Sequence, residues 1–332
     1  MSNKNKVAII FTGGTISMKI DPRIHAAIPA LTSEEIISMV TNIENFSEIE
    51  VINYANIPSP HITPSMMMEI ANLVKETAAR DDITGIIVTH GTDTLEETAY
   101  LLDLIIKTDK PIVVVGAMRN GSELGYDGSS NLSAALCTAI SSKAKNKGVL
   151  VVMNNEVNAA SEVTKTNTLS LDTFKSPEFG PLGIVDNDEV IFYRNIVAHQ
   201  FIDTNIIEEK VGLIKSVPGT ESDILDFYIN AGYRGIVIEA LGRGNLPPQM
   251  VPGIERAISQ NIPVVMVSRC PTGRVLDSYG YEGGGKHLRE LGVIFGGNLP
   301  GQKIRIKLML ALGLTTDMKE IKEIIEQNLF IQ

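Results

Sequence analysis

Two short segments of this sequence place a threonine directly after a glycine, beside other residues that could take part in chemistry. The first is Thr12–Ile16 (TGGTI), in which Thr15 follows two glycines; the second is His90–Thr94 (HGTDT), in which Thr92 precedes a carboxylate. Glycine lets the backbone bend sharply and lets a substrate approach closely, so the adjacent hydroxyl is a candidate nucleophile. Either segment taken alone is more simply explained as an ordinary Gly-Thr turn.

Each segment follows a short apolar run that predicts a buried strand. Val7–Phe11 leads into the first segment, and Ile86–Val88 leads into the second. Thr94 and Glu97 form a capping-box pattern, which predicts that a helix begins at Asp93 or Thr94. In open α/β sheets ligands bind where strands end and helices begin, and helix-start N–H groups favour anionic groups. We therefore expect both threonines at a ligand-binding edge of a sheet.

A threonine hydroxyl is a weak nucleophile and needs a nearby base, for which Lys165 is the strongest candidate. Lys165 lies in the polar, non-periodic segment Val163–Asn167 and could act if burial or neighbouring charges let its ammonium lose a proton. Asp93 could orient that lysine or bind the ammonium group of a substrate. The simpler alternatives are a solvated surface lysine at Lys165 and a helix N-cap at Asp93.

The composition predicts a globular protein without a nucleic-acid partner. The chain has 332 residues, of which 44% are hydrophobic and 20% are charged, so it is long enough for two domains with a sizeable core. Its formal net charge of −10 argues against a basic nucleic-acid-binding surface. The two cysteines, Cys137 and Cys270, are too few for a disulfide framework, and both are expected to be core thiols in a reducing compartment.

No segment is expected to direct the chain into or across a membrane. Residues 1–6 are polar and lead directly into the first strand, without the apolar region or cleavage site of a signal peptide. No apolar run approaches the roughly 20 residues that a spanning helix needs. We therefore expect a cytoplasmic protein with no membrane partner.

Strand and helix patterns alternate along most of the chain, which predicts an α/β fold. We expect a large N-terminal domain, residues 1–193, with a doubly wound, mostly parallel sheet. The alternation lapses over residues 194–210, which we interpret as a linker, and a smaller C-terminal α/β domain is expected at residues 211–332. Within the first domain, Ser17–Leu31 is polar and contains prolines, so it is expected to be a loop that could act as a mobile lid.

Several catalytic motifs are missing or incomplete. There is no G-x-S-x-G or H-E-x-x-H motif, and the five histidines are scattered, so no metal site is expected. No G-x-G-x-x-G follows the first strand, which argues against a dinucleotide. Gly280–Lys286 (GYEGGGK) has the spacing of a phosphate loop, but His287 stands where Ser or Thr would bind magnesium and no strand is predicted before it. These departures disfavour ATP binding.

The two Gly-Thr segments together resemble the paired signature of the bacterial-type L-asparaginase (asparaginase/glutaminase) family. The resemblance continues in the family's order along nearly the whole chain, through the segments Glu96–Ala99, Val115–Arg119, Asp127–Gly128, Val163–Asn167, Pro181–Gly183, Ala231–Tyr233, Gly235–Val237 and Pro271–Gly273. It implies a large N-terminal and a small C-terminal domain, and homodimers or homotetramers with active sites between subunits. It also implies that no metal or organic cofactor is needed.

The resemblance implies amide hydrolysis through an acyl-enzyme, with release of ammonia. Thr15 matches the family's nucleophile, and Thr92, Asp93 and Lys165 match its second triad, which helps to activate the nucleophile or water. Asp93 also matches the residue that holds the amino group of the substrate.

Further residues are implied to bind the substrate. Ser59 matches the residue that binds the α-carboxylate. Gly14 and Gly91 accompany the backbone N–H groups, around Gly14 and Thr92, that would stabilise the oxyanion. Glu282 matches a carboxylate that reaches into the site of a neighbouring subunit.

The sequence departs from the family's pattern in the predicted lid. Members of the family usually carry a tyrosine there, whereas Ser17–Leu31 contains none and Ala26 or Ala27 stands in its place. Tyr279 or Tyr281 could supply the hydroxyl from elsewhere.

A second departure lies beside Ser59. Pro60 offers no N–H or side-chain donor, so one contact to the substrate is lost or is replaced, with His61 as the candidate. The expected substrate is L-asparagine, hydrolysed to L-aspartate. The same chemistry on L-glutamine, D-asparagine or another small amide stays open, as does a non-catalytic amino-acid-binding protein on the same fold.

Overall fold

The computed structural model describes residues 6–40 and 48–327, which form two compact units that divide between Phe201 and Ile202. The predicted linker, residues 194–210, includes this point. Its own limits, and those of the domains at 1–193 and 211–332, stay predictions.

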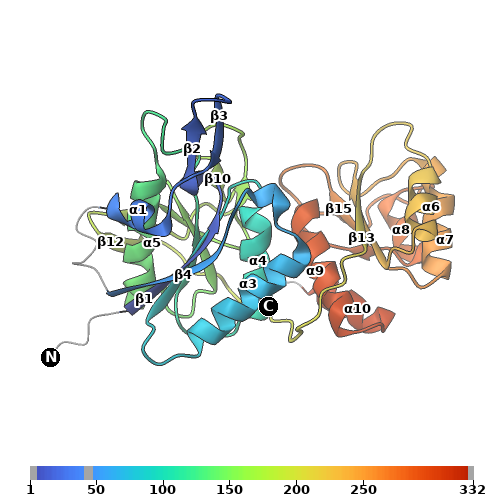
Figure 1. Ribbon diagram of the computed structural model, residues 1–332. Coiled ribbons are helices and arrows are strands. Elements are labelled where there is room, and N and C mark those ends of the chain that lie inside the picture. Colours follow the sequence, from blue (N-terminus) through green and yellow to red (C-terminus); the bar gives the residue numbers. More distant parts are fainter. Residues whose placement is uncertain (1–5, 41–47, 328–332) are drawn as a thin grey trace. The chain divides into compact units, whose positions relative to one another are not determined.

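The first unit is built on an eight-stranded sheet (Figure 1). Its strands are β1 (Lys6–Gly13), β4 (Glu48–Ile57), β5 (Gly85–Thr89), β6 (Ile112–Val115), β7 (Val149–Met153), β8 (Glu156–Ala159), β11 (Gly183–Asp186) and β12 (Glu189–Phe192). Their order is β12-β11-β8-β7-β6-β5-β1-β4. The strands from β4 to β7 pair in parallel, as predicted, and β8, β11 and β12 add an antiparallel edge that the sequence pattern did not indicate.

Helices cover both faces of this sheet. They are α1 (Ser33–Ser38), α3 (Pro64–Ala78), α4 (Leu95–Ile105) and α5 (Gly128–Ile140), and the single-turn 3-10 helices are η1 (Thr15–Ser17), η2 (Ser59–His61) and η3 (Ser142–Ala144). Figure 1 shows α3 and α4 on one side of the sheet and α1 and α5 on the other. Strands β5 and β6 are buried along their whole length, because a parallel sheet covered on both faces needs near-continuous apolar runs.

Local capping signals fix the starts of α1 and α3. Thr32 and Glu35 form the expected capping box at α1, and the Thr63 hydroxyl caps α3 with Pro64 at its first position. Helix α4 begins after Thr94, as predicted, but the Thr94 side chain does not cap it. The predicted capping box is wrong there, because the Thr94 hydroxyl donates to a carbonyl on η2 instead.

The segment predicted as a loop at Ser17–Leu31 is a β-hairpin. Strands β2 (Met18–Asp21) and β3 (Ala26–Pro29) pair in antiparallel fashion. Each strand has only four residues, and a proline ends the second, so alternation was too short to detect. A second small sheet pairs β9 (Thr164–Lys165) with β10 (Phe174–Lys175).

The second unit contains a fully parallel four-stranded sheet in the order β13-β14-β15-β16, and it is the smaller α/β unit that was predicted. The strands are β13 (Val211–Lys215), β14 (Gly235–Ala240), β15 (Val264–Ser268) and β16 (Ile294–Phe295). The helices are α6 (Asp223–Asn230), α7 (Val251–Ser259), α8 (Gly285–Leu291), α9 (Gly301–Leu314) and α10 (Met318–Glu326), with the 3-10 turn η4 (Pro248–Met250).

Helix α8 was not predicted, and it starts inside the segment that has phosphate-loop spacing. The imidazole of His287, where a phosphate loop has a hydroxyl, accepts the backbone N–H of Gly283 at 3.2 Å. Cys137 is buried in α5 as predicted, whereas Cys270 is exposed in the loop after β15, so the prediction of a core thiol is wrong for Cys270. In residues 6–40 and 48–327, no helix has the length and apolarity needed to cross a membrane.

Candidate active site

The turns that follow β1 and β5 touch one another. Gly13 and Gly14 have φ angles of +106° and +88°, which only glycine adopts without strain. A Cβ atom on Gly14 would lie 2.3 Å from the Cα of Gly91, so the two glycine backbones are in direct contact. The hydroxyl of Thr12 donates to the Thr89 carbonyl at 2.7 Å and joins the two strand ends. The two predicted Gly-Thr segments therefore lie together at one edge of the eight-stranded sheet, where β1 and β5 end.

Thr15 is the first residue of η1 and is half-buried. The turn is held by the Ser17 N–H and hydroxyl, which both donate to the Gly14 carbonyl at 2.9 Å. From the loop before α5, the Tyr126 hydroxyl donates to the Ile16 carbonyl at 2.7 Å, and burial raises the pKa of this phenol. No local sequence pattern around Tyr126 indicates this contact, because its partner lies 110 residues away.

Three of the predicted catalytic residues form a hydrogen-bonded group. The Lys165 ammonium donates to the Thr92 hydroxyl at 2.9 Å and to the Asp93 carboxylate at 2.8 Å. The Lys165 side chain is 17% exposed, so it is not a freely solvated lysine. The Asp93 side chain is 63% exposed, and the N-cap of α4 is Thr94 rather than Asp93. Both simpler alternatives for these residues are therefore wrong.

Ser59 lies against the same edge. It is buried as the first residue of η2, and a Cβ atom on Gly91 would lie 2.7 Å from the Ser59 Oγ. The Thr94 hydroxyl donates to the Ser59 carbonyl at 3.0 Å, which ties η2 to the start of α4. Pro60 and His61 are exposed on the same turn.

His90 is a structural part of this edge that sequence reasoning missed. Its ring is completely buried, and burial lowers its pKa to about 4, so it is neutral at pH 7. Nδ1 lies 2.8 Å from the Gly91 carbonyl, which can only accept, so Nδ1 carries the proton. Nε2 then accepts from the Thr98 hydroxyl at 2.8 Å. The imidazole thus joins the Gly91 turn to α4.

Glu96, in the first turn of α4, is a second buried group at this edge. One of its oxygens accepts from the Thr164 hydroxyl at 3.1 Å and from the Lys165 N–H at 3.2 Å. In the sequence, Glu96 stands out only as part of the family resemblance, in the segment Glu96–Ala99.

The remaining predicted residues lie in other parts of the chain. Ala26 and Ala27 are exposed on β3. Glu282, Tyr279 and Tyr281 are exposed in the second unit, in the segment before α8, and the two tyrosine rings lie 5.7 Å apart. The contribution of Glu282 or of either tyrosine to an active site stays a prediction.

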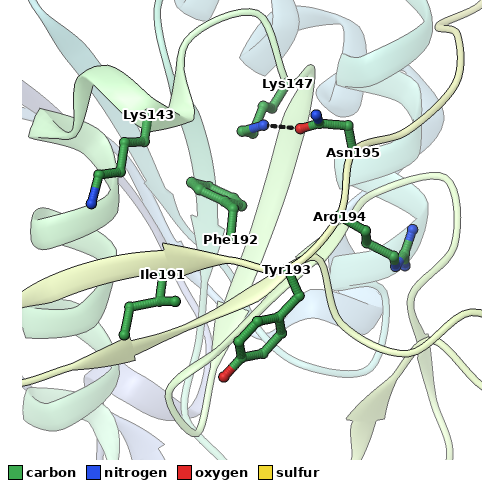
Figure 2. A pocket seen from close by; sticks show the side chains of 7 residues that line it. All are labelled: Lys143, Lys147, Ile191, Phe192, Tyr193, Arg194 and Asn195. Atoms are coloured by element: carbon green, nitrogen blue, oxygen red, sulfur yellow. Dashed lines mark hydrogen bonds between the residues drawn. The ribbon is translucent and has the colours of Figure 1, made fainter.

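A cavity of about 410 Å³ lies at the β12 end of the sheet rather than at this edge (Figure 2). No predicted site residue lines it; its walls are Lys143, Lys147, Ile191, Phe192, Tyr193, Arg194 and Asn195. Two of its cations already have partners, since Lys147 donates to the Asn195 side chain and Arg194 pairs with Glu162. In the part of the chain that the structure describes, no three His, Cys, Asp or Glu side chains gather as a metal site would require.

The chain is similar to known proteins over nearly its whole length. It matches the family models "Asparaginase, N-terminal" over residues 6–198 and "Glutaminase/Asparaginase C-terminal domain" over residues 210–325. A probable periplasmic L-asparaginase of Haemophilus influenzae is 36% identical over 328 residues, which cover 96% of this chain and 92% of that protein. One of the subunits of the glutamyl-tRNA(Gln) amidotransferase of Methanobrevibacter smithii is 33% identical over 340 residues, which cover 98% of this chain and 76% of that protein.

A solved structure extends the similarity to the fold. The crystal structure of a probable cytoplasmic L-asparaginase from Campylobacter jejuni matches with a TM-score of 0.88 at 34% sequence identity, and it covers 98% of this chain and 100% of that one. The family indicated by the two Gly-Thr segments is thereby confirmed. This chain is an amidohydrolase and belongs to the asparaginase family.

Proposed function

We propose that this protein hydrolyses L-asparagine to L-aspartate and ammonia, with Thr15 as the nucleophile. The observation that carries the proposal is the Lys165 ammonium bonded to Thr92 and Asp93, at the edge where the turn of Thr15 touches Gly91. Relatives from Haemophilus influenzae and Campylobacter jejuni are named as L-asparaginases, which supports this substrate.

Substrate binding would use the two ends of the amino acid. The Ser59 hydroxyl suits the α-carboxylate, and the exposed Asp93 carboxylate suits the α-ammonium group. Ser59 lies against Gly91, and the turn of Thr15 touches Gly91. Asp93 follows Gly91 by two residues. The substrate would therefore extend from Ser59 and Asp93 toward Thr15. This positioning supplies the close approach that a weak hydroxyl nucleophile needs.

In the first step the Thr15 Oγ attacks the side-chain amide carbon. A C–O bond forms, the carbonyl electron pair moves to oxygen, and backbone N–H groups around Gly14 and Thr92 stabilise the oxyanion. The C–N bond then breaks, and the nitrogen leaves as ammonia with the proton that the hydroxyl lost. Water hydrolyses the resulting acyl-enzyme and restores Thr15.

Lys165 orients the second hydroxyl for proton transfer. Because an ammonium can only donate, the Thr92 oxygen accepts from Lys165 and the Thr92 proton must point elsewhere. Thr92 can therefore donate a proton to one group and accept a proton from another, and Lys165 stabilises the negative charge that develops on its oxygen.

A second candidate substrate is L-glutamine, with D-asparagine and other small amides as further alternatives. It is favoured by Pro60, which supplies no donor beside Ser59, and by Ala26 and Ala27, which supply no hydroxyl. The relative from Methanobrevibacter smithii is part of a glutamyl-tRNA(Gln) amidotransferase, which also favours keeping this alternative. A non-catalytic amino-acid-binding protein is the remaining alternative.

Ammonia release separates these alternatives. Initial rates should be measured with L-asparagine, D-asparagine, L-glutamine and dipeptide amides, for the wild type, Thr15→Ala and Thr15→Ser. We expect L-asparagine to be the best substrate and Thr15→Ala to be inactive, with Thr15→Ser retaining partial activity and the acyl-enzyme. Full activity in Thr15→Ala would rule out the nucleophile, and calorimetric binding without turnover would favour the binding protein.

We infer that the protein is cytoplasmic and forms homodimers or homotetramers whose sites include Glu282 of a neighbouring subunit. The Campylobacter jejuni structure is named cytoplasmic and the Haemophilus influenzae relative is named periplasmic, so fractionation of cells is the direct test. Light scattering after gel filtration tests the assembly, and a monomer with full activity would contradict it.

A further inference from the structure

Lys165 lies on a strand that does not belong to the eight-stranded sheet. Strand β9 has two residues and pairs only with β10, and within the described residues no strand pairing joins it to β5 or its neighbours. Thr92 and Asp93, which Lys165 contacts, lie in the turn after β5. Something other than a sheet ladder must therefore set the distance between the lysine and its partners.

Glu96 spans this gap. It lies in the first turn of α4, four residues after Thr92, and it is buried. Its Oε1 accepts both the Thr164 hydroxyl and the Lys165 N–H, so both residues of β9 are attached to the same oxygen. A carboxylate in the first turn of a helix is also favoured by the helix dipole, which suits this end of α4.

Within residues 6–40 and 48–327, the second oxygen of Glu96 has no partner, which lowers the stability of the fold. Among the described residues, Glu96 Oε2 is buried and has no hydrogen-bond partner. A carboxylate oxygen buried without a partner costs about 1–3 kcal/mol or more. Glu96 therefore combines two bonds to β9 through Oε1 with the cost of an Oε2 that is unpaired in the described part of the chain.

We propose that Glu96 is a positioning residue for Lys165, and that it acts by fixing the backbone of β9 rather than by contacting the substrate. This inference rests on the proposed function. By holding the Lys165 N–H, Glu96 sets where the side chain begins and so keeps its ammonium within reach of Thr92 and Asp93. A displacement of about 1 Å at such a group can lower the rate about 100-fold.

The test is a double-mutant cycle with Glu96→Leu and Lys165→Met. Glu96→Leu removes both acceptor bonds without opening a large cavity, and we expect it to lower kcat for L-asparagine about 30-fold with a smaller change in KM. In the Lys165→Met background the same substitution should change kcat less than about 2-fold, because the group it positions is gone. An equal loss in both backgrounds would overturn the proposal.

Two further variants separate positioning from loss of stability. Glu96→Gln keeps an oxygen acceptor and should retain at least a third of the activity; a loss as large as that of Glu96→Leu would contradict the role. Asp103 is also buried on α4, but its carboxylate accepts the N–H of Val149, which lies on β7 rather than on β9, at 2.8 Å. Asp103→Asn should lower the melting temperature and leave kcat unchanged.

One further variant tests the proposal if Glu96→Leu does not fold, and a crystal structure tests it if the wild type shows no turnover. Thr164→Val removes one of the two donors and should lower kcat a few-fold, with Thr164→Ser restoring it. If the wild type releases no ammonia, the proposed function fails, but a crystal structure of Glu96→Leu still tests the positioning. We expect Lys165 Nζ to leave hydrogen-bond distance of the Thr92 hydroxyl, and an unchanged lysine would overturn the inference.

Discussion

The turns after β1 and β5 meet at one edge, yet different forces hold them. The first turn depends on backbone shape, since Gly13 and Gly14 have positive φ angles and Gly14 is packed against Gly91. The second turn depends on side chains: Lys165 donates to Thr92 and Asp93, and the buried His90 and Glu96 attach the surrounding backbone.

This difference predicts two kinds of sensitivity. The first turn should tolerate changes of side-chain chemistry nearby but not an added Cβ atom, because neighbouring backbone cannot move aside. The second turn should lose activity more than stability when a donor or acceptor is removed, because its side chains orient one another through hydrogen bonds. Four substitutions test this contrast, in order of expected effect.

Gly14→Ala should have the largest effect. The added Cβ would lie 2.3 Å from the Cα of Gly91 at a φ of +88°, so unfolding free energy should fall by on the order of 3 kcal/mol or more and activity should be lost. Gly180→Ala is the matched control, with a φ of +70° and no atom within 4 Å of the new Cβ, and it should cost only about 1 kcal/mol. Urea unfolding measures both; equal losses would contradict a packed first turn.

Lys165→Met should remove activity while the fold remains. We expect kcat/KM to fall about 100- to 1000-fold, because the Thr92 hydroxyl loses the donor that orients it for proton transfer. Because Asp93 is mostly exposed, water replaces the lysine as its partner, and stability should change by about 1 kcal/mol or less. Ammonia release and thermal melting measure the two quantities. If Lys165→Met lost as much stability as Gly14→Ala, the turns after β1 and β5 would not differ in what stabilises them.

His90→Gln should change how stability depends on pH. Burial lowers the pKa of His90 to about 4 in the folded state, below its ordinary value of about 6.5 when unfolded. Its contribution is therefore complete above pH 6.5 and is lost as pH falls toward 4, by about 3 kcal/mol in all. Gln does not titrate, so the stability difference between wild type and variant should shrink by that amount. Urea unfolding at several pH values tests this, and parallel curves would be evidence against it.

Tyr126→Phe should have the smallest effect. It removes one hydrogen bond to the Ile16 carbonyl, so we expect a loss of about 1 kcal/mol and a few-fold fall in kcat as the turn of Thr15 loosens. Tyr54→Phe removes the hydroxyl that donates to Glu69 at 2.6 Å and serves as the control. It should lower stability without lowering kcat. A similar fall in kcat for both variants would show that the effect is not specific to the Thr15 turn.

Local pattern was a reliable guide for the elements that hold the site. The apolar runs at Val7–Phe11 and Ile86–Val88 are strands β1 and β5, and α4 begins where the sequence indicated. Pattern failed for the short hairpin at Met18–Pro29 and for α8, whose seven residues are too few to show a clear period. It also failed for Cys270, because the burial of a single thiol depends on neighbours distant in sequence.

The sequence by itself determined the α/β class, the two Gly-Thr turns at strand ends and the family, because strand and helix periods and short motifs are local properties of the chain. Only the tertiary structure decided that Lys165 contacts Thr92, 73 residues earlier, and that His90 is buried and neutral. It also decided that one Glu96 oxygen accepts hydrogen bonds from both residues of β9. Such contacts join side chains whose separation is set by the path of the backbone through the sheet, and no local pattern encodes that path.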